Sequence, residues 1–210
     1  SVDSFAASPL ESVNYIECHD NHTLWDRILI STLQDASVTD ADRRAMDKLG
    51  AVVLFTSEGI PFIQSGQEWL RTKSGDHNSY DKTDAVNLIR WRQKAENYDV
   101  YAYYRGLIAL FHKHRLFRYR TAKSASSAVK FLDDQLGLPV PQGCIAYQIE
   151  DVRGVDEWCR ALILLNANGK RVEFTIPPGI WKIYGDARQV GTTPIAHSIS
   201  SFQDDRAFVA

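Results

Sequence analysis

The sequence lacks the features that mark membrane proteins and nucleic-acid-binding proteins. No apolar run reaches the roughly 18 residues that a membrane-spanning helix needs, and residues 1–11 lack the basic start and apolar core of a secretory signal. The formal net charge is only -2 and the pI is about 6.3, so the positive surface of a nucleic-acid-binding protein is missing. We therefore expect neither a membrane nor a nucleic acid as partner.

Cysteine is scarce as well. Cys18, Cys144 and Cys159 are far apart in the chain and form no C-x-x-C pair, which argues against a disulfide framework and against a zinc ribbon. A reducing compartment fits this usage best, so we expect a cytoplasmic rather than a secreted protein, although one pair could bridge in an oxidising compartment. Glycine and proline occur at ordinary frequencies, which excludes collagen-like and disordered chains.

The first half of the chain alternates between strand and helix patterns. Residues 13–17 form a short β-prone run, and the apolar run 61–65 between two glycines predicts a second buried strand. Between them, residues 40–57 keep helical periodicity, and Thr39 and Asp42 have the spacing of a capping box. This alternation predicts parallel α/β structure.

Two further helices follow the second strand. We expect Thr83 to cap a short helix and Asp99 to cap a longer one, whose apolar residues repeat at helical spacing as far as Phe111. Arg115, Arg118 and Arg120 then form a basic group, most simply a solvated helix end that complements the helix dipole.

The second half of the chain has the pattern of a small antiparallel sandwich. Its β-rich runs are separated by turn signals and lie near residues 129–132, 144–150, 161–166, 172–176 and 181–184. We therefore predict two domains, residues 1–120 with α/β structure and residues 121–210 with all-β structure.

A polar cluster, Glu17-Cys18-His19-Asp20-Asn21-His22, stands where the first strand ends. Groups at the carboxyl end of a parallel strand face the functional mouth of barrel and open-sheet folds. Three interpretations are open. A metal site is disfavoured because adjacent side chains on a strand point to opposite faces. The residues could simply form a turn, or Asp20 and His19 could hydrogen-bond a hydroxyl-rich ligand.

The motif V-N-Y-I-E-C-H-D-N-H-T-L-W-D closely resembles the fourth signature region of the α-amylase superfamily of glycoside hydrolases, in the form typical of type I pullulanases. The later stretch E-G-I-P-F-I-Q-S-G-Q-E-W-L-R-T-K-S-G-D-H-N-S-Y resembles the eighth barrel strand of that family and the loop after it. The resemblance covers about residues 10–118. Cys18 departs from the family pattern, which usually has serine at this position.

This resemblance implies a fold, a reaction and a set of site residues. The fold is the carboxyl-terminal fragment of a (β/α)8 barrel, its last two units, followed by a β-sandwich. The reaction is retaining hydrolysis of α-1,6-glucosidic linkages in pullulan, starch or glycogen dextrins, without a cofactor or a metal. The implied transition-state stabiliser is Asp20, and the implied substrate-binding residues are His19, Asn21, Asp76, Asn78 and Tyr80.

The nucleophile and the acid/base of this family precede the H-D-N region, on the fourth and fifth barrel strands. By that count both lie upstream of this chain, so we expect the isolated chain to be inactive and the upstream part of the barrel to be its partner. By residue type alone, the missing nucleophile and acid/base could be replaced by Glu17, Glu58, Glu68 or Asp76, but nothing in their spacing sets up such a pair. We expect Glu58 to be exposed on the surface.

Two rival functions remain open at this stage. In a non-catalytic glucan-binding or structural fragment, Trp158, Trp181 and Tyr184 of the β-rich half could form a sugar-binding platform, although such rings usually fill sandwich cores. Trp25 and Trp69 could likewise stack on sugars or pack in a core. The weaker rival is a metallohydrolase that uses His19 and His22.

Overall fold

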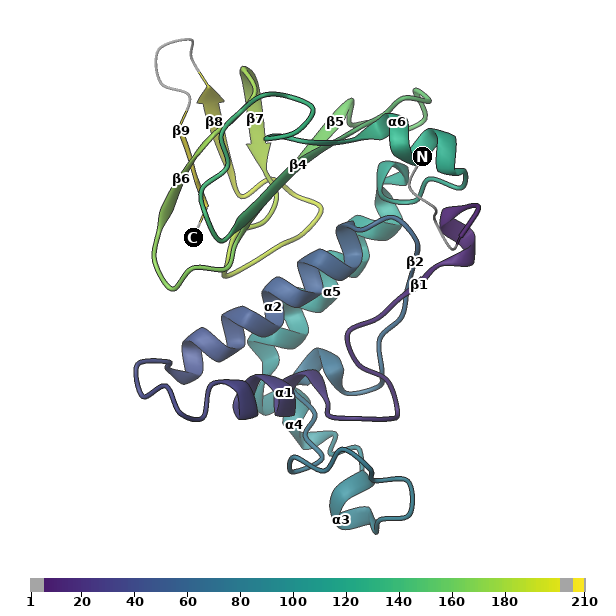
Figure 1. Ribbon diagram of the computed structural model, residues 1–210, viewed down its shortest axis with the longest axis vertical. Coiled ribbons are helices and arrows are strands. Elements are labelled where there is room, and N and C mark those ends of the chain that lie inside the picture. The colour runs from purple at the N-terminus through teal and green to yellow at the C-terminus, as the bar shows by residue number, and fades with distance from the viewer. Residues whose placement is uncertain (1–5, 201–205, 210) are drawn as a thin grey trace.

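The computed structural model describes residues 6–200 and 206–209, and its first half places two short parallel strands beside long helices (Figure 1). Strand β1 (Val13–Asn14) follows the short 3-10 helix η1 (Pro9–Glu11) and pairs with β2 (Ile60–Pro61), so that Val13 lies opposite Ile60. The parallel pairing confirms the predicted α/β pattern, although both strands are shorter than the runs 13–17 and 61–65.

Helix α2 (Asp40–Thr56) ends one residue before the predicted end at 57. The predicted capping box is present, because the Asp42 amide donates to Thr39 Oγ1 at 3.2 Å and the Thr39 amide donates to Asp42 Oδ2 at 2.8 Å. Helix α1 (Leu24–Ser31) was missed, although Thr23 and Asp26 have the same spacing and the Asp26 amide donates to Thr23 Oγ1.

Helix α5 (Tyr98–Lys113) corrects one prediction. Its N-cap is Asn97, so Asp99 already lies inside the first turn. Asp99 instead accepts hydrogen bonds from Arg44 Nη1 and Lys48 Nζ, each at 3.0 Å, and so joins α5 to α2. The remaining helices of this half are η2 (Gln67–Trp69), α3 (Asp84–Asn87, with Thr83 as N-cap), α4 (Arg92–Glu96) and η3 (Arg115–Phe117). Among the described residues no helix is both long and apolar enough to cross a membrane.

The second half begins with α6 (Ala122–Ala128), which was not predicted, and continues as antiparallel strands. Three small sheets have the strand orders β3-β4-β5, β6-β9 and β7-β8. The strands are β3 (Val129–Phe131), β4 (Cys144–Glu150), β5 (Arg160–Asn166), β6 (Val172–Thr175), β7 (Gly179–Ile183), β8 (Ala196–Ser200) and β9 (Arg206–Val209). All five β-rich runs of the sequence therefore contain strands.

The sheet β3-β4-β5 is covered on both faces, which explains why β4 carries four consecutive buried residues. Tyr147 and Ile149 pack in a core with Leu116 and Phe117 from the end of the α/β half. Ala146 points the other way, into a core with Phe174 and Ile176. The first of these cores contains residues from both sides of position 120, so the division at that position stays a prediction.

Helix α5 also contacts the chain beyond β7 very closely. Gly106 faces the backbone of Val190, and a Cβ added to Gly106 would lie 2.0 Å from the Val190 carbonyl oxygen. Tyr103 extends this contact, since its hydroxyl donates to the Asp186 carbonyl oxygen at 2.9 Å. Only glycine permits this approach of helix and loop.

We therefore expect Gly106→Ala to destabilise the chain by about 1–3 kcal/mol through overpacking, although alanine favours a helix over glycine by about 1 kcal/mol. Urea unfolding followed by circular dichroism measures this change. The control is Gly50→Ala in α2, where the added methyl group meets only the side chains of Ile16 and Leu24. Equal stability of Gly106→Ala and the unmodified chain would contradict the close contact.

Candidate functional site

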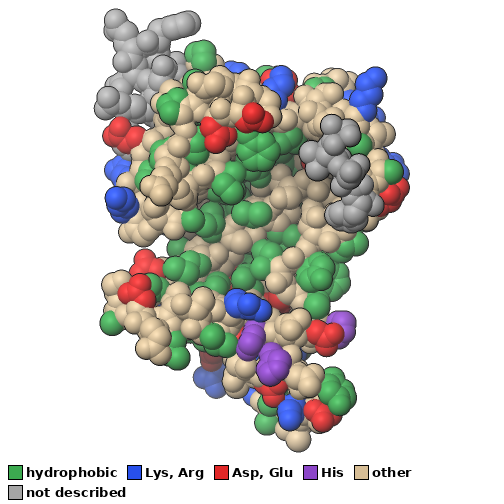
Figure 2. Space-filling model, in the orientation of Figure 1, with side chains coloured by type: hydrophobic (Ala, Val, Ile, Leu, Met, Phe, Trp, Pro, Cys, Tyr) green, Lys and Arg blue, Asp and Glu red, His purple; other side chains and the backbone are tan. Residues whose placement is uncertain are grey.

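Two polar loops lie at the same edge of the strand pair. Residues 17–22 follow β1, and the longer loop at residues 66–80 follows β2. Because parallel strands end at the same edge, both loops emerge there together. The ring centroids of His22 and His77 are 5.7 Å apart, and histidine side chains gather on the lower half of the face drawn in Figure 2. The structure thus brings the two motifs of the sequence together.

Asp20 lies open to solvent in the first loop. Its side chain is 66% exposed, and its Oδ2 lies 3.4 Å from Nε2 of His19, whose side chain is 84% exposed. Asp20, Asn21 and His22 line a pocket of about 250 Å³ together with Arg27. Asn21 has a φ of 61°, a left-handed conformation that asparagine tolerates better than most residues and that turns the loop sharply.

A buried lysine and a buried aspartate hold this loop in place. Lys73, 1% exposed, donates from Nζ to the His19 carbonyl oxygen at 3.2 Å. Asp26 at the start of α1 accepts from the Lys73 amide at 2.8 Å and also from Thr72 Oγ1. The two loops are therefore tied to each other and to α1. Sequence reasoning missed this role of Asp26, which the capping spacing from Thr23 could have indicated.

Two further acids are buried beneath the loops. Burial raises the pKa of Glu17 to about 7, and its carboxylate accepts from the Leu24 amide. Burial also raises the pKa of Asp47 to about 8; its Oδ1 accepts from the Tyr104 hydroxyl at 3.1 Å. That hydroxyl in turn accepts from Gln67 Nε2 at 3.1 Å. These contacts form a polar layer that supports the loops from below.

The second loop is fixed by local hydrogen bonds and left-handed residues. Asp76 Oδ1 accepts from the Asn78 amide at 2.8 Å, which makes Asp76 at least a turn-forming residue. Tyr80 is 81% exposed and is free to contact a ligand. Leu70 is buried with a φ of 63°, a strained conformation for leucine of the kind that clusters near functional sites. The substrate-binding roles of Asp76, Asn78 and Tyr80 stay predictions.

The other candidate acids all have structural partners. Glu68 Oε2 accepts from the Gly66 amide at 2.9 Å. The expectation of a surface-exposed Glu58 is wrong, because Glu58 is half-buried, accepts from the Tyr119 amide at 2.8 Å, and has a pKa raised by burial to about 7. Among the side chains that the structure describes, no group of three or more histidine, cysteine and acidic residues is arranged to hold a metal ion.

Four of the five tryptophans, Trp25, Trp69, Trp158 and Trp181, pack against protein, whereas Trp91 is exposed. Trp69 is only 2% exposed, and Trp25 packs against the core between α2 and α5. Trp158 stacks on His114 with ring centroids 3.5 Å apart, and the Trp181 indole donates to the Pro177 carbonyl oxygen at 3.0 Å. These contacts favour core packing over the sugar-binding platform for Trp158 and Trp181.

The arrangement agrees with the fold that the sequence resemblance implies. Parallel strands with helices and a following antiparallel part are what the last units of an α-amylase-type barrel and its β-sandwich would contain. The strand pair does not close a barrel within the described residues.

Comparison with known protein sequences identifies pullulanases as relatives of this chain. The sequence family "Pullulanase, all-beta domain" matches residues 137–189. The pullulanase of Bacillus subtilis strain 168 is 36% identical over 173 residues, which cover 82% of this chain and 23% of the relative. The chain is thus a homologue of pullulanases of glycoside hydrolase family 13 and spans about a quarter of their length.

Solved structures of pullulanases also match this chain. The pullulanase from Bacillus acidopullulyticus matches with a TM-score of 0.87 and 36% identity, over 99% of this chain and 24% of that one. The type I pullulanase from Bacillus subtilis strain 168, complexed with maltose, matches with a TM-score of 0.84 and 29% identity, over 97% of this chain and 26% of that one. This chain therefore corresponds to the carboxyl-terminal region of these enzymes.

The buried acids predict a pH-dependent stability. A carboxyl whose pKa is raised in the folded state stabilises the fold at pH values below its unfolded pKa and loses that contribution as the pH rises through its folded pKa. For Asp47 this window runs from about pH 4 to about pH 8. Between pH 5 and pH 8 we expect the unfolding free energy of Asp47→Asn to decrease less than that of the unmodified chain, by more than about 1.4 kcal/mol. The reason is that asparagine mimics the neutral acid and does not titrate.

Urea titrations at several pH values measure this slope. Asp133→Asn is the matched control, because Asp133 is an exposed acid between β3 and β4. The same slope in Asp47→Asn and in the unmodified chain would show that Asp47 does not retain its proton in the folded state.

Proposed function

We propose that this chain is the carboxyl-terminal part of a retaining hydrolase that cleaves α-1,6-glucosidic linkages in pullulan, starch or glycogen dextrins. Its first half supplies the last two units of a (β/α)8 barrel, and its second half supplies a β-sandwich. The observation that carries this proposal is the exposed Asp20 at the carboxyl end of a parallel strand, held by a loop from the neighbouring strand.

In this proposal Asp20 is the third carboxylate of the active site. As an ionised acceptor it binds hydroxyl groups of the sugar next to the cleaved bond and favours the distorted ring of the transition state. His19 and Asn21 hydrogen-bond the same region, and His19 has the exposure that this role needs. The maltose held by the related Bacillus subtilis enzyme supports an α-glucan as the ligand.

Asp76, Asn78 and Tyr80 bind the neighbouring part of the glucan in this proposal. The contact of His22 with His77 supports this role, because it brings the second loop next to the first. The exposed Tyr80 ring is suited to stacking on a sugar face.

The nucleophile and the acid/base come from polypeptide upstream in this proposal. Retaining hydrolysis needs two carboxyl groups about 5–5.5 Å apart across the bond. Glu17 and Glu68 each accept a hydrogen bond from a backbone amide, which gives both carboxyls a structural role. The strand pair also has an uncovered apolar surface, since Val13, Tyr15 and Phe62 are 55%, 58% and 44% exposed. Neighbouring barrel strands and helices would cover such a surface.

The first test is the activity of the isolated chain. We expect no release of reducing ends from pullulan or a branched dextrin, because the bond-breaking carboxyl groups are not in this chain. A full-length pullulanase under the same conditions is the positive control, and circular dichroism verifies that the chain is folded. Turnover clearly above a buffer blank would refute the assignment of the nucleophile and the acid/base to upstream polypeptide.

The second test joins the chain to an upstream barrel segment and replaces Asp20. We expect Asp20→Asn to lower kcat at least about a hundredfold, because a lost transition-state hydrogen bond costs roughly 3–4 kcal/mol. KM should change much less. Asp81→Asn removes an exposed acid that directly follows the second loop and should leave kcat unchanged. Equal losses in the two variants would contradict a special role of Asp20.

A further inference from the structure

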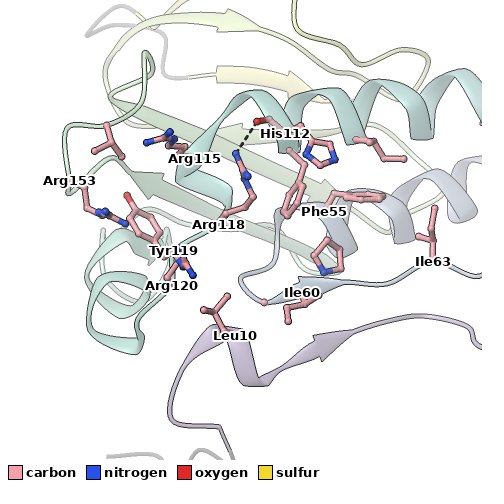
Figure 3. Close-up of a pocket in the computed structure, with 15 residues that line it drawn as sticks. Leu10, Phe55, Ile60, Ile63, His112, Arg115, Arg118, Tyr119, Arg120 and Arg153 are labelled. Atoms are coloured by element: carbon pink, nitrogen blue, oxygen red, sulfur yellow. Dashed lines mark hydrogen bonds between the residues drawn. The ribbon is translucent and has the colours of Figure 1, made fainter.

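The cavity drawn in Figure 3 belongs to the uncovered side of the strand pair. Its volume is about 790 Å³, and Leu10 and Ile60 lie in its wall. In the proposed function, upstream polypeptide covers this side, so we assign no ligand to the cavity. Arg118, from the predicted basic group, has a partner within the chain, because it donates from Nη2 to the His112 carbonyl oxygen at 2.9 Å.

The segment that carries Tyr80 differs from this cavity, because buried groups of this chain hold it. Residues 79–87, here called the tip, comprise the turn at residues 79–82 and helix α3. Figure 1 shows α3 at the lower end of the molecule, apart from the long helices. Ser79 is 5% exposed whereas Tyr80 is 81% exposed. The turn is thus anchored at its first residue and leaves the next side chain open to a ligand.

Asn87 closes this turn. Its Nδ2 donates to the Ser79 carbonyl oxygen at 2.6 Å and to the Lys82 carbonyl oxygen at 3.0 Å. The Lys82 amide also donates to the Ser79 carbonyl oxygen, at 3.1 Å. A side-chain amide nitrogen has two protons, and here each has an acceptor at one end of the turn. One side chain therefore holds both ends of the turn that presents Tyr80.

Arg71 joins Asn87 to the body of the chain. Arg71 is only 8% exposed and donates from Nη2 to the Asn87 main-chain carbonyl oxygen at 2.8 Å. The stem of Arg71 lies directly against Gly66, where an added Cβ would come within 2.8 Å of the Arg71 Cβ and Cδ atoms. The position of the guanidinium group is therefore restricted by packing as well as by hydrogen bonds.

Gln64 extends this path to the Asp20 loop. In the amide orientation that satisfies both of its neighbours, Gln64 donates to the Cys18 carbonyl oxygen at 2.9 Å and accepts from Arg71 Nη1 at 3.3 Å. Cys18 lies two residues before Asp20. A guanidinium group is a rigid planar fork, so the two acceptors of Arg71 have a fixed relative position. A continuous path of hydrogen bonds thus runs from the Asp20 loop to the tip.

We propose that Gln64, Arg71 and Asn87 are positioning residues that set the place of Tyr80 relative to Asp20. None of the three contacts the glucan in this proposal. They act through the Cys18 carbonyl group at one end of the path and through the turn at the other. The inference rests on the proposed function for the contact of Tyr80 with a glucan, whereas the hold on the tip is measurable without a glucan.

Hydrogen exchange of the 210-residue chain, followed by mass spectrometry, tests the hold on the tip. Asn87→Asp keeps the shape of the side chain but replaces the donating group by an oxygen, so both bonds to the turn are lost. We expect the Lys82 and Val86 amides, which donate within the tip, to exchange at least about tenfold faster. Asp84→Asn changes an exposed residue of the same tip and should leave these rates unchanged. Unchanged rates in Asn87→Asp overturn the proposal.

The variant Gln64→Leu tests the connection to the Asp20 loop. Gln64 lies outside the tip, yet we expect the tip amides to exchange at least about threefold faster in this variant, because Arg71 loses one acceptor. The amides of α2 and α5 should exchange as in the unmodified chain, which verifies that the fold is retained. Tip rates that do not change in Gln64→Leu overturn the connection.

Kinetics of the chain joined to an upstream barrel segment test the positioning of Tyr80. Asn87→Asp and Tyr80→Ala should each raise KM for a branched dextrin and leave kcat nearly unchanged, because both remove binding common to the ground state and the transition state. The double variant should have the KM of Tyr80→Ala, since Asn87 acts through Tyr80. Asp84→Asn is again the control. Additive increases in KM overturn the positioning role.

The two measurements separate this inference from the proposed function. An unchanged KM in Tyr80→Ala overturns the glucan contact of Tyr80, which belongs to the proposed function, and with it the kinetic role of Asn87. Faster exchange of the tip in Asn87→Asp and Gln64→Leu would then still support the hydrogen-bonded path. Unchanged exchange in both variants overturns the path, whatever the activity of the joined enzyme.

Discussion

The parallel pairing of β1 with β2 is the constraint on which the candidate site depends. The Ile60 amide donates to the Ser12 carbonyl oxygen and the Phe62 amide donates to the Asn14 carbonyl oxygen, at 2.9 and 2.8 Å. These bonds place two loops that are about fifty residues apart in sequence at one edge. An antiparallel pair would send the same loops to opposite ends, and Asp20 would have no neighbour from the second motif.

The strand pairing fixes only where the two loops begin. Buried polar groups beneath the loops hold the rest of each loop in place by hydrogen bonds. Asp26 and Lys73 connect the loops through backbone atoms, so the position of His19 depends on a lysine that contacts no solvent. Glu17 and Asp47 in this layer each accept a hydrogen bond, from the Leu24 amide and the Tyr104 hydroxyl, and burial raises the pKa of both carboxyls. The exposed residues of the candidate site are thus held in place by buried ones.

The sequence predicted regular elements better than the contacts between them. Residues 40–57 were predicted as a helix because apolar periodicity and a capping box agree, and the polar cluster at 17–22 was recognised because residue types in a motif need no tertiary information. The N-cap at Asp99 was wrong because Asp99 serves α2 through Arg44 and Lys48, a contact between segments that are distant in sequence. The hydrogen bond from the Tyr119 amide to Glu58 is a tertiary contact of the same kind.

The sheet β3-β4-β5 faces two different interiors, and this has a consequence for how the chain can vary. Large side chains such as Tyr147 and Ile149 fill one interior, and the small Ala146 contacts the other. Inserting or deleting a single residue in β4 would send each side chain to the wrong interior, so that bulky groups would crowd one face and leave voids on the other. Changes of length in homologous sequences should therefore accumulate in the connections and be absent from these strands.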